Sequence, residues 1–593
     1  MSRRSVLSGR VLGALVAVLA TVTTTSAAGA SVSAEAGGGG PAHGRFDNPR
    51  HGFAPPGTVL RDAAPARVGL DPAPIEEAVA TVGGWTTSHP TPGTAHPLYS
   101  GAVTLLAHDG AVVSRSATGY AVRYADAAGT ELPQEQRVPM RGDTIFDMAS
   151  VTKLFTSIVV MQLVESGDVD VDAPVADYLP EFGVNGKESI TVAQLLTHTS
   201  GLVSWVPLWS RYPDVPSRIQ AVMDIAPRTT PGTNYEYSDL NLITLGVLVE
   251  RLTGDRLDEV VARRITRPLR MTDTGFNPPA SKLDRMVATE FQATPPRGMV
   301  RGSVHDENAW SLDGVAGHAG IFSTADDLAV LAQTILNGGS YRGARILRPA
   351  TVAAMLDNHN EEFPANAHGY GFELDQIWFM GGLTGPRTAG HTGFTGTDLV
   401  IDLASRSFAI LLTNRVHPSR NWGSINLARE TLSTGLAKAL AVEPERGRDS
   451  WYTGIGDASQ STLTTVSLRP SGHVRVVFDA FVDSEVTDRL MLEASADGLT
   501  WEPVPLTVSG RGAPEEEVVS LSGTGHRDWW TVRAQVPHAA EITLRWRFVT
   551  DARYTGRGIN VDNLIITDRD QMLLNGEKEP HRVRPEGWQL RSR

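Results

Sequence analysis

The chain has 593 residues, of which 41% are hydrophobic and 20% are charged, and its formal net charge at pH 7 is -13. This composition is typical of a folded globular protein, and the length exceeds what one hydrophobic core usually supports, so we expect at least two domains. The absence of cysteine excludes disulfides, a thiol nucleophile and thiolate metal sites, and an acidic chain without a concentrated basic face does not indicate a nucleic-acid partner.

The N-terminal residues predict export. A pair of arginines precedes the apolar run 11–22, which is too short to span a bilayer, and a small-x-small cleavage signature ends at Ala30. This pattern indicates a signal peptide over residues 1–30, and the paired arginines also resemble a twin-arginine signal. We expect a secreted or cell-wall-associated protein with no membrane span after the signal is removed.

Composition divides the rest of the chain into four segments. Residues 31–60 are rich in Ala, Gly and Pro and predict a flexible tether, and the charged, Pro- and Gly-containing residues 441–450 predict a linker. Between them, residues 61–440 predict a mixed α/β domain, with a sheet that draws strands from both ends and a helical insertion. Residues 451–593 predict an all-β sandwich resembling a jelly roll.

The elements expected in the α/β domain follow from hydrophobic periodicity. In chain order they are a β-hairpin at 102–107 and 111–120, a strand at 144–146, helices after Ser150 and at 192–197, 240–252 and 325–336, a strand opening at His391 and ending at 398–401, a strand at 408–412, and an amphipathic helix at 425–440. In the C-terminal domain strands are expected at 473–481, 489–494, 529–536, 541–549 and 559–566.

The segment Ser150-Val151-Thr152-Lys153 places a serine and a lysine three residues apart at the start of a helix. Side chains with this spacing share a helix face, so Lys153 can reach the hydroxyl of Ser150. A serine hydroxyl needs a base before it becomes a good nucleophile, and a partly buried lysine with a depressed pKa can act as that base. The alternative is a helix N-cap followed by a surface lysine.

Two further motifs stand downstream. Tyr237-Ser238-Asp239 follows a Pro-Gly-Thr turn, and His391-Thr392-Gly393 opens a predicted strand. With these motifs the chain resembles the serine β-lactamase, penicillin-binding-protein and esterase family, nearest to its class C and D-alanyl-D-alanine carboxypeptidase branch. The resemblance covers roughly residues 60–440 and includes the ordered segments 190–202, 271–276 and 317–324.

The resemblance implies catalytic roles. Ser150 would attack the substrate carbonyl with the assistance of Lys153, and Tyr237 would take the hydroxyl proton and deliver it to the leaving group. The backbone N–H groups of Ser150 and Phe394 would form the oxyanion hole. The family needs neither a metal nor a cofactor, so none is expected here.

The resemblance also implies substrate contacts from the third motif. His391 and Thr392 would lie on the strand at the edge of the cleft, where Gly393 would let substrate approach the backbone closely. Two residues depart from the family pattern. Asp239 replaces an asparagine and can only accept hydrogen bonds when ionised, and His391 replaces a lysine, so positive charge at this position depends on pH.

Two other clusters have alternative explanations. The segment 305–308 and His318 match no standard zinc spacing, so we expect them to order a loop beside the cleft. Residues 556–563 resemble a segment of jelly-roll accessory domains, where turn chemistry and a calcium or glycan contact both fit.

The sequence therefore predicts an exported serine hydrolase that acylates Ser150 with a small ester or a D-amino-acid-terminated peptide. Carboxypeptidase and esterase activity both remain open, and β-lactamase activity is a further alternative. From another class, the chain could be a non-catalytic protein that binds cell wall or glycan, with its C-terminal domain as the contact.

Overall fold

The computed structural model describes residues 44–569 and 571–592. The predicted signal peptide and the first part of the predicted tether lie outside the described residues. Within residues 44–569 and 571–592, no helix has both the length and the apolar character needed to cross a membrane.

An eight-stranded sheet organises the α/β domain. Its strand order is β1-β3-β2-β15-β14-β13-β12, with β4 paired to β3, and every pairing except β1 with β3 is antiparallel. The strands are β1 (Arg61–Asp62), β2 (Gly101–His108), β3 (Ala111–Val122), β4 (Val138–Pro139), β12 (Glu373–Leu374), β13 (Thr388–Gly393), β14 (Thr397–Asp402) and β15 (Ser407–Thr413). As predicted, this sheet joins strands from both ends of the domain.

Helices and three small sheets fill the region between those strands and flank it. The helices are α1 (Pro72–Gly84), α2 (Thr152–Ser166), α3 (Val192–Leu196), α4 (Leu208–Arg211), α5 (Val215–Asp224), α6 (Asp239–Thr253), α7 (Leu257–Val261), α8 (Arg267–Leu269), α9 (Glu307–Ser311), α10 (Ala325–Leu336), α11 (Pro349–Leu356), α12 (Ile377–Met380) and α13 (Asn426–Ala439). The small sheets pair β5 (Phe146–Asp147) with β9 (Ile321–Ser323) and β6 (Gly275–Phe276), β7 (Ala288–Gln292) with β8 (Gly298–Arg301), and β10 (Ser340–Tyr341) with β11 (Ala344–Arg345).

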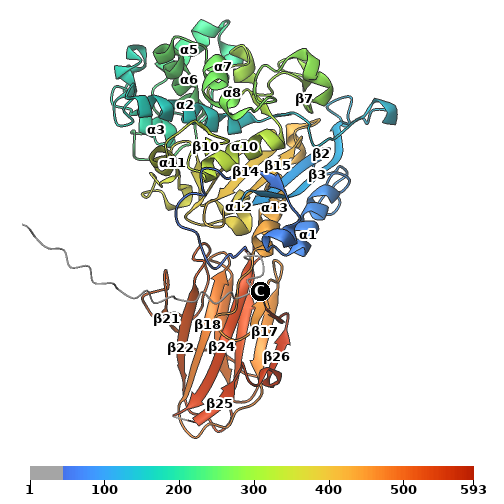
Figure 1. Cartoon of the computed structure of the whole chain (residues 1–593), viewed down its shortest axis with the longest axis vertical. Helices are drawn as coiled ribbons and strands as arrows, with labels where there is room; N and C mark the ends of the chain where they lie inside the picture. Colours follow the sequence, from blue (N-terminus) through green and yellow to red (C-terminus); the bar gives the residue numbers. More distant parts are fainter. Residues whose placement is uncertain (1–43, 570, 593) are drawn as a thin grey trace, which may run out of the picture. The chain divides into compact units, whose positions relative to one another are not determined.

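Strand β2 shows why helices cover both faces of the main sheet. Alternate side chains of a strand point to opposite faces. Val103 and Leu105 join the hydrophobic core formed with α2 and α10, whereas Ala102 and Leu106 join the core formed with α1 and α13. Because both faces are apolar, the sheet must be covered on both sides, and the domain has three layers (Figure 1).

One predicted strand is wrong. The segment from His391 to Ile401 forms two strands, β13 and β14, which pair as a hairpin with Gly393 opposite Thr397. The chain reverses at Gly396, whose φ of 107° is accessible to glycine, and a Cβ there would overlap the Thr413 hydroxyl. The turn at Gly396 therefore divides the predicted strand into two.

The C-terminal residues form the predicted β-sandwich. Its sheets contain β16 (Ser450–Thr453), β18 (Val474–Asp483), β21 (Thr507–Ser509), β22 (Trp529–Val536), β24 (Gly558–Asp568), β25 (Gln571–Asn575) and β27 (Gln589–Arg591) on one side, and β17 (Gln460–Thr465), β19 (Arg489–Ser495), β20 (Glu502–Pro503), β23 (Thr543–Val549) and β26 (Val583–Glu586) on the other. Alternate residues of β23 are buried, and Trp546 packs edge-on against Phe478 of the facing sheet.

Part of the predicted tether is packed instead of flexible. Phe46 is fully buried, and its backbone N–H donates to the carbonyl of Ala441 at 2.7 Å. Arg45 forms an ion pair with Asp47. Composition alone did not reveal this packing, because one aromatic residue in an Ala/Gly/Pro-rich segment has no periodicity.

Helix α2 supplies a stability test, because Gly167 ends it in the left-handed region with φ 82°. No atom lies within 4 Å of a Cβ built at Gly167, so Gly167→Ala would be strained by its backbone alone and should cost about 1 kcal/mol in urea unfolding. Gly142→Ala is the matched control, because Gly142 has equal space and no positive φ. Equal midpoints for both variants would contradict this explanation.

Candidate active site

Ser150 lies in a short 3-10 turn (Ala149–Val151) that leads into α2. The preceding residue, Ala149, adopts φ 44°, which is unfavourable for a side chain with a Cβ. The buried carboxylate of Asp147 holds this turn by accepting from the Ala149 N–H at 2.9 Å and from the His305 N–H at 2.6 Å. The serine is therefore presented on a backbone that other segments fix in place.

Lys153 is completely buried, and three acceptors surround its ammonium group. Its Nζ donates to Ser150 Oγ at 2.9 Å, to Asp239 Oδ1 at 2.8 Å and to the His318 carbonyl at 3.2 Å. Burial lowers the pKa of Lys153, but the charges and hydrogen bonds of Asp239 and Tyr237 together outweigh it and raise the pKa above the ordinary value. The expectation of a depressed lysine pKa was wrong, because Asp239 pairs directly with the ammonium.

The loop around His318 supplies the third acceptor for Lys153. The ring Nε2 of His318 lies 2.9 Å from the carboxylate of Asp306, which also caps α9 by accepting from the Ala309 N–H. Burial would raise the pKa of Asp306, but His318 holds it below the ordinary range. These contacts are of the kind expected for residues that order a loop beside the cleft.

Tyr237 approaches the same lysine from the start of α6. The Nζ of Lys153 lies 4.8 Å from the centre of the Tyr237 ring. Burial raises the pKa of Tyr237 to about 12, although the neighbouring ammonium opposes this rise. The phenol is therefore neutral in the resting protein at neutral pH.

His198 positions Tyr237, a role that sequence reasoning missed. The two rings lie 4.5 Å apart, and the buried His198 Nδ1 accepts from the Ser238 N–H at 3.0 Å. Burial lowers the pKa of His198 well below its ordinary value. A neutral imidazole thus packs behind the phenol. The ordered segment 190–202 was the sequence signal, but it indicated family likeness rather than this contact.

His391 lies on β13 and is almost completely buried. Its Nδ1 donates to the Thr392 carbonyl at 2.8 Å, and its Nε2 has no hydrogen-bond partner in the described part of the chain. Burial lowers the pKa of His391 to about 3. The imidazole is therefore neutral at physiological pH, and the expected pH-dependent positive charge is not supplied here.

Gly393 is needed for a different contact from the one expected. A Cβ at this position would overlap the carbonyl oxygen of Met148, two residues before Ser150, and the Thr397 hydroxyl. The missing side chain lets the end of β13 meet the backbone that carries Ser150. In this way, the sheet edge and the serine turn are fixed against each other.

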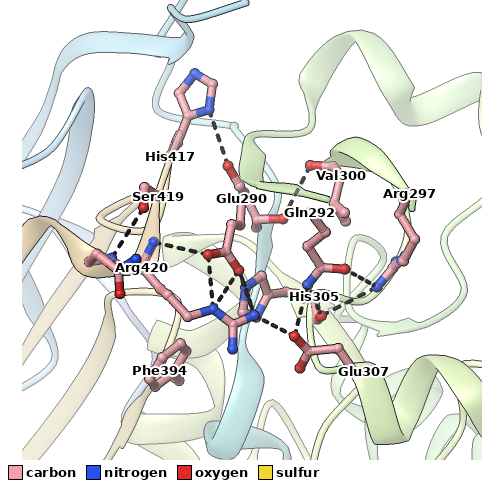
Figure 2. Close-up of polar contacts among 12 residues, drawn as sticks. Glu290, Gln292, Arg297, Val300, His305, Glu307, Phe394, His417, Ser419 and Arg420 are labelled. Carbon is pink, nitrogen blue, oxygen red and sulfur yellow. Dashed lines mark hydrogen bonds and ion pairs between the residues drawn. The ribbon is translucent and has the colours of Figure 1, made fainter. Parts of the chain in front are cut away.

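A network of charged residues holds Phe394 (Figure 2). The exposed Phe394 ring stacks on His305 at 5.8 Å, with the guanidinium of Arg420 5.6 Å from the ring centre. Glu290 joins these two residues, lying 2.9 Å from His305 Nε2 and accepting from Arg420 Nε at 2.7 Å. Burial would raise the pKa of Glu290, but His305 and Arg420 hold it at about 2, so the network stays charged.

A cavity of about 540 Å³ opens at Ser150. Of the predicted site residues, it is lined by Ser150, Tyr237, Thr392, Gly393 and Phe394, whereas Lys153, Asp239 and His391 are not among its lining residues. Sequence reasoning missed other polar and aromatic residues that line it, namely Tyr235, His368, Glu373, Trp378, Arg415, Asn426 and Arg429. Most of them come from different segments of the chain, and together they form no motif that the sequence would reveal.

Two of these missed residues carry charge chemistry. Glu373 is 8% exposed, and its buried Oε2 has no partner among the described residues, so burial raises the pKa of the carboxyl to about 7. Arg415 donates from Nε to the Phe394 carbonyl at 2.8 Å and is only partly buried. The cavity therefore offers a titrating carboxyl group and an accessible cation.

A serine held by a buried lysine, beside the edge of an antiparallel sheet flanked by helices, defines a serine-hydrolase site. Residues 91–430 match the family model described as Beta-lactamase, so the chain belongs to the β-lactamase family and is a hydrolase of that family.

Two relatives and one solved structure illustrate the similarity. The chain is 35% identical over 350 residues (54% of this chain, 78% of the relative) to the Bacillus subtilis (strain 168) "N-acetylmuramyl-L-alanine amidase". It is 31% identical over 394 residues (60% and 86%) to the Escherichia coli (strain K12) "Putative D-alanyl-D-alanine carboxypeptidase". The structure of "EstCE1, a hydrolase with promiscuous acyltransferase activity" aligns with TM-score 0.49 and 21% identity over 62% of this chain and 99% of that one.

The ion pair makes Asp239→Asn a test of the lysine's charge. Without the carboxylate, burial should dominate and lower the pKa of Lys153, and the variant should unfold about 2 kcal/mol more easily at pH 7. In wild type, the pKa of Lys153 is higher in the folded state than in the unfolded state. Its contribution to the free energy of unfolding is therefore fully present below the unfolded-state pKa, and it is lost only as the pH rises through the folded-state pKa. In the variant, the pKa of Lys153 should be lower in the folded state than in the unfolded state. The free energy of unfolding should therefore rise with pH as the unfolded-state pKa is approached.

The measurement is urea unfolding of both proteins from pH 7 to pH 10. We expect the difference in unfolding free energy between wild type and Asp239→Asn to become smaller as the pH rises. A constant or widening gap would mean that Asp239 does not set the protonation of Lys153.

Proposed function

We propose that this protein hydrolyses an amide bond through an acyl-enzyme on Ser150. The observation that carries the proposal is the hydrogen bond from the buried Lys153 ammonium to Ser150 Oγ, at a point where the serine faces a cavity. A solvated helix lysine would not be paired in this way. The alternative of an N-cap serine followed by a surface lysine does not fit the burial of Lys153.

The protonation states suggest how the serine is activated. Lys153 carries the proton at rest, so its ammonium stabilises negative charge on its neighbours, and it lowers the cost of ionising Tyr237. We infer that Tyr237 first loses its own proton to solvent and that the Lys153 ammonium stabilises the resulting phenolate. The phenolate takes the Ser150 proton as the serine oxygen bonds to the substrate carbonyl, and Tyr237 later gives that proton to the leaving amine. Water then attacks the acyl-enzyme while the Tyr237 phenolate takes its proton, and Tyr237 returns this proton to Ser150 Oγ as the acid product leaves.

The oxyanion that forms on the substrate needs backbone donors. Ser150 and Phe394 both line the cavity, and their N–H groups are the donors that we propose. Contacts with both parts of Phe394 support this role, because His305 and Arg420 pack on its ring (Figure 2) and Arg415 Nε donates to its carbonyl at 2.8 Å. Asp239 then acts by holding Lys153, since its carboxylate points at the ammonium.

The substrate that we propose is a peptide derived from peptidoglycan, with a carboxylate near the scissile amide. Arg415 is the partly exposed cation of the described cavity wall, and a guanidinium pairs well with a carboxylate. The names of the two relatives also refer to N-acetylmuramyl-L-alanine and to D-alanyl-D-alanine. We further propose that the protein is exported and that the sandwich contacts cell wall or glycan, which would bring the site to this substrate.

Ser150→Ala should abolish acylation. Wild-type protein incubated with a fluorophosphonate should gain one label by intact-mass spectrometry, and the variant should gain none and lose about 1000-fold or more of its hydrolytic rate. Ser210→Ala, a change at an exposed serine away from the cavity, is the matched control and should label normally. Labelling of the Ser150 variant, or no label on wild type from any acylating probe, would rule out the nucleophile and favour a binding protein.

Substrate class is tested with peptides that differ at one group. Wild type should cleave a D-Ala-D-Ala peptide or a muramoyl-L-Ala peptide, and should prefer the free acid over its carboxamide by about tenfold in kcat/KM. Arg415→Gln should reduce this preference to near unity. Release of D-alanine would identify a carboxypeptidase, and release of the peptide from the sugar an amidase. Turnover confined to short esters or to β-lactams would overturn the proposal of a peptide substrate.

A further inference from the structure

The loops at one end of the C-terminal sandwich bring three carboxylates together. Glu485 and Asp488 lie between β18 and β19, and Asp551 follows β23. Each offers a carboxylate oxygen, and these oxygens all lie within 4.8 Å of one another. Such proximity of like charges is unfavourable unless a proton or a cation lies between them.

Asp488 is the buried member of this acidic cluster. Its exposure is 0%, and its Oδ1 accepts from the Asp551 N–H at 2.9 Å, but its Oδ2 has no partner among the described residues. The charged groups that face it are Glu485, Asp551 and Asp457, and all are acidic. Burial, together with these charges, raises the pKa of Asp488 to about 6. The buried Asp488 Oδ2 therefore lies among acidic side chains and has no hydrogen-bond donor among the described residues.

Glu485 and Asp551 are close enough for their carboxyl groups to share a hydrogen. Glu485 also accepts from the Thr487 hydroxyl at 2.7 Å, and Asp551 accepts from the Arg553 N–H at 2.8 Å. The Arg553 charge lowers the pKa of both acids, but within the described residues its guanidinium forms no ion pair with them. Local donors thus leave most of the negative charge uncompensated.

We propose that Glu485, Asp488 and Asp551 bind a calcium ion. Calcium takes six to eight oxygen ligands in flexible geometry, and Glu485 and Asp551 are partly exposed, so water can complete the shell. Asp457, which accepts from the Thr555 hydroxyl at 2.7 Å, adds a fourth carboxylate nearby. Magnesium fits less well, because it demands near-ideal octahedral geometry and gives up its water reluctantly.

The ion would join the two sheets of the sandwich. β18 belongs to one sheet, and β19 and β23 belong to the other. Glu485 and Asp488 lie where the chain crosses between the sheets, and Asp551 leaves from the second sheet. Calcium would therefore tie together two loops that the hydrophobic core does not reach.

The test uses the full chain, freed of metal with a chelator, in titration calorimetry with CaCl2 and in thermal unfolding. Wild type should bind one calcium and unfold at a higher temperature with calcium than without it. Glu485→Gln and Asp551→Asn should each weaken calcium binding about tenfold or more, and should unfold at the same or higher temperature than wild type when calcium is absent, because repulsion is relieved. Substitution of a residue with only a structural role would not weaken calcium binding while leaving the calcium-free protein equally or more stable.

Glu502→Gln is the matched control, because Glu502 is an exposed acid on β20 whose loss changes the charge equally. It should keep calcium binding unchanged. No calcium-dependent heat or thermal shift in wild type, or unchanged binding in both cluster variants, would overturn the proposal. Tighter binding of MgCl2 than of CaCl2 would overturn the assignment to calcium.

Discussion

The site depends on one ion pair, between the buried Lys153 ammonium and Asp239. An unpaired ammonium in this position would be costly, so the carboxylate, the serine hydroxyl and the His318 carbonyl must all meet it. These groups come from the Ser150 turn, from the first residue of α6 and from the loop before β9. The electrostatic requirement of one side chain thus aligns three segments that are distant in sequence.

Backbone constraints fix the other half of the site. Ala149 is held at a positive φ by Asp147, whose second oxygen binds the His305 N–H. His305 also stacks on Phe394, so one buried carboxylate couples the turn that carries the nucleophile to the loop that carries the other proposed oxyanion donor. Gly393 completes the coupling, because the absence of a Cβ lets β13 meet the Met148 carbonyl. The strain at Ala149 is thus balanced by contacts on both sides of the cleft.

Sequence reasoning reached the fold and the motif residues because both leave local patterns. Periodicity gave α2, α6, α10 and the sandwich strands, and spacing alone put Lys153 within reach of Ser150. Prediction from sequence failed where the role of a residue depends on contact with a partner that is distant in the chain. The pairing of Asp239 with Lys153 was not foreseen, and Phe46 was expected in a flexible tether and is buried. Glu373 and Arg415 have no motif, because only the folded sheet brings them to the cavity.

The neutral state of His391 changes which group can select a substrate. Burial and its Nδ1–H bond to the Thr392 carbonyl leave Nε2 as an acceptor without charge near neutral pH. Charge selection then passes to Arg415, which keeps its proton because its pKa, although lowered by burial, remains about 10. Glu373 opposes it, since its pKa of about 7 adds a negative charge to the cavity as the pH rises. An anionic substrate should therefore meet the most favourable field where Arg415 is charged and Glu373 still holds its proton, on the acidic side of neutrality.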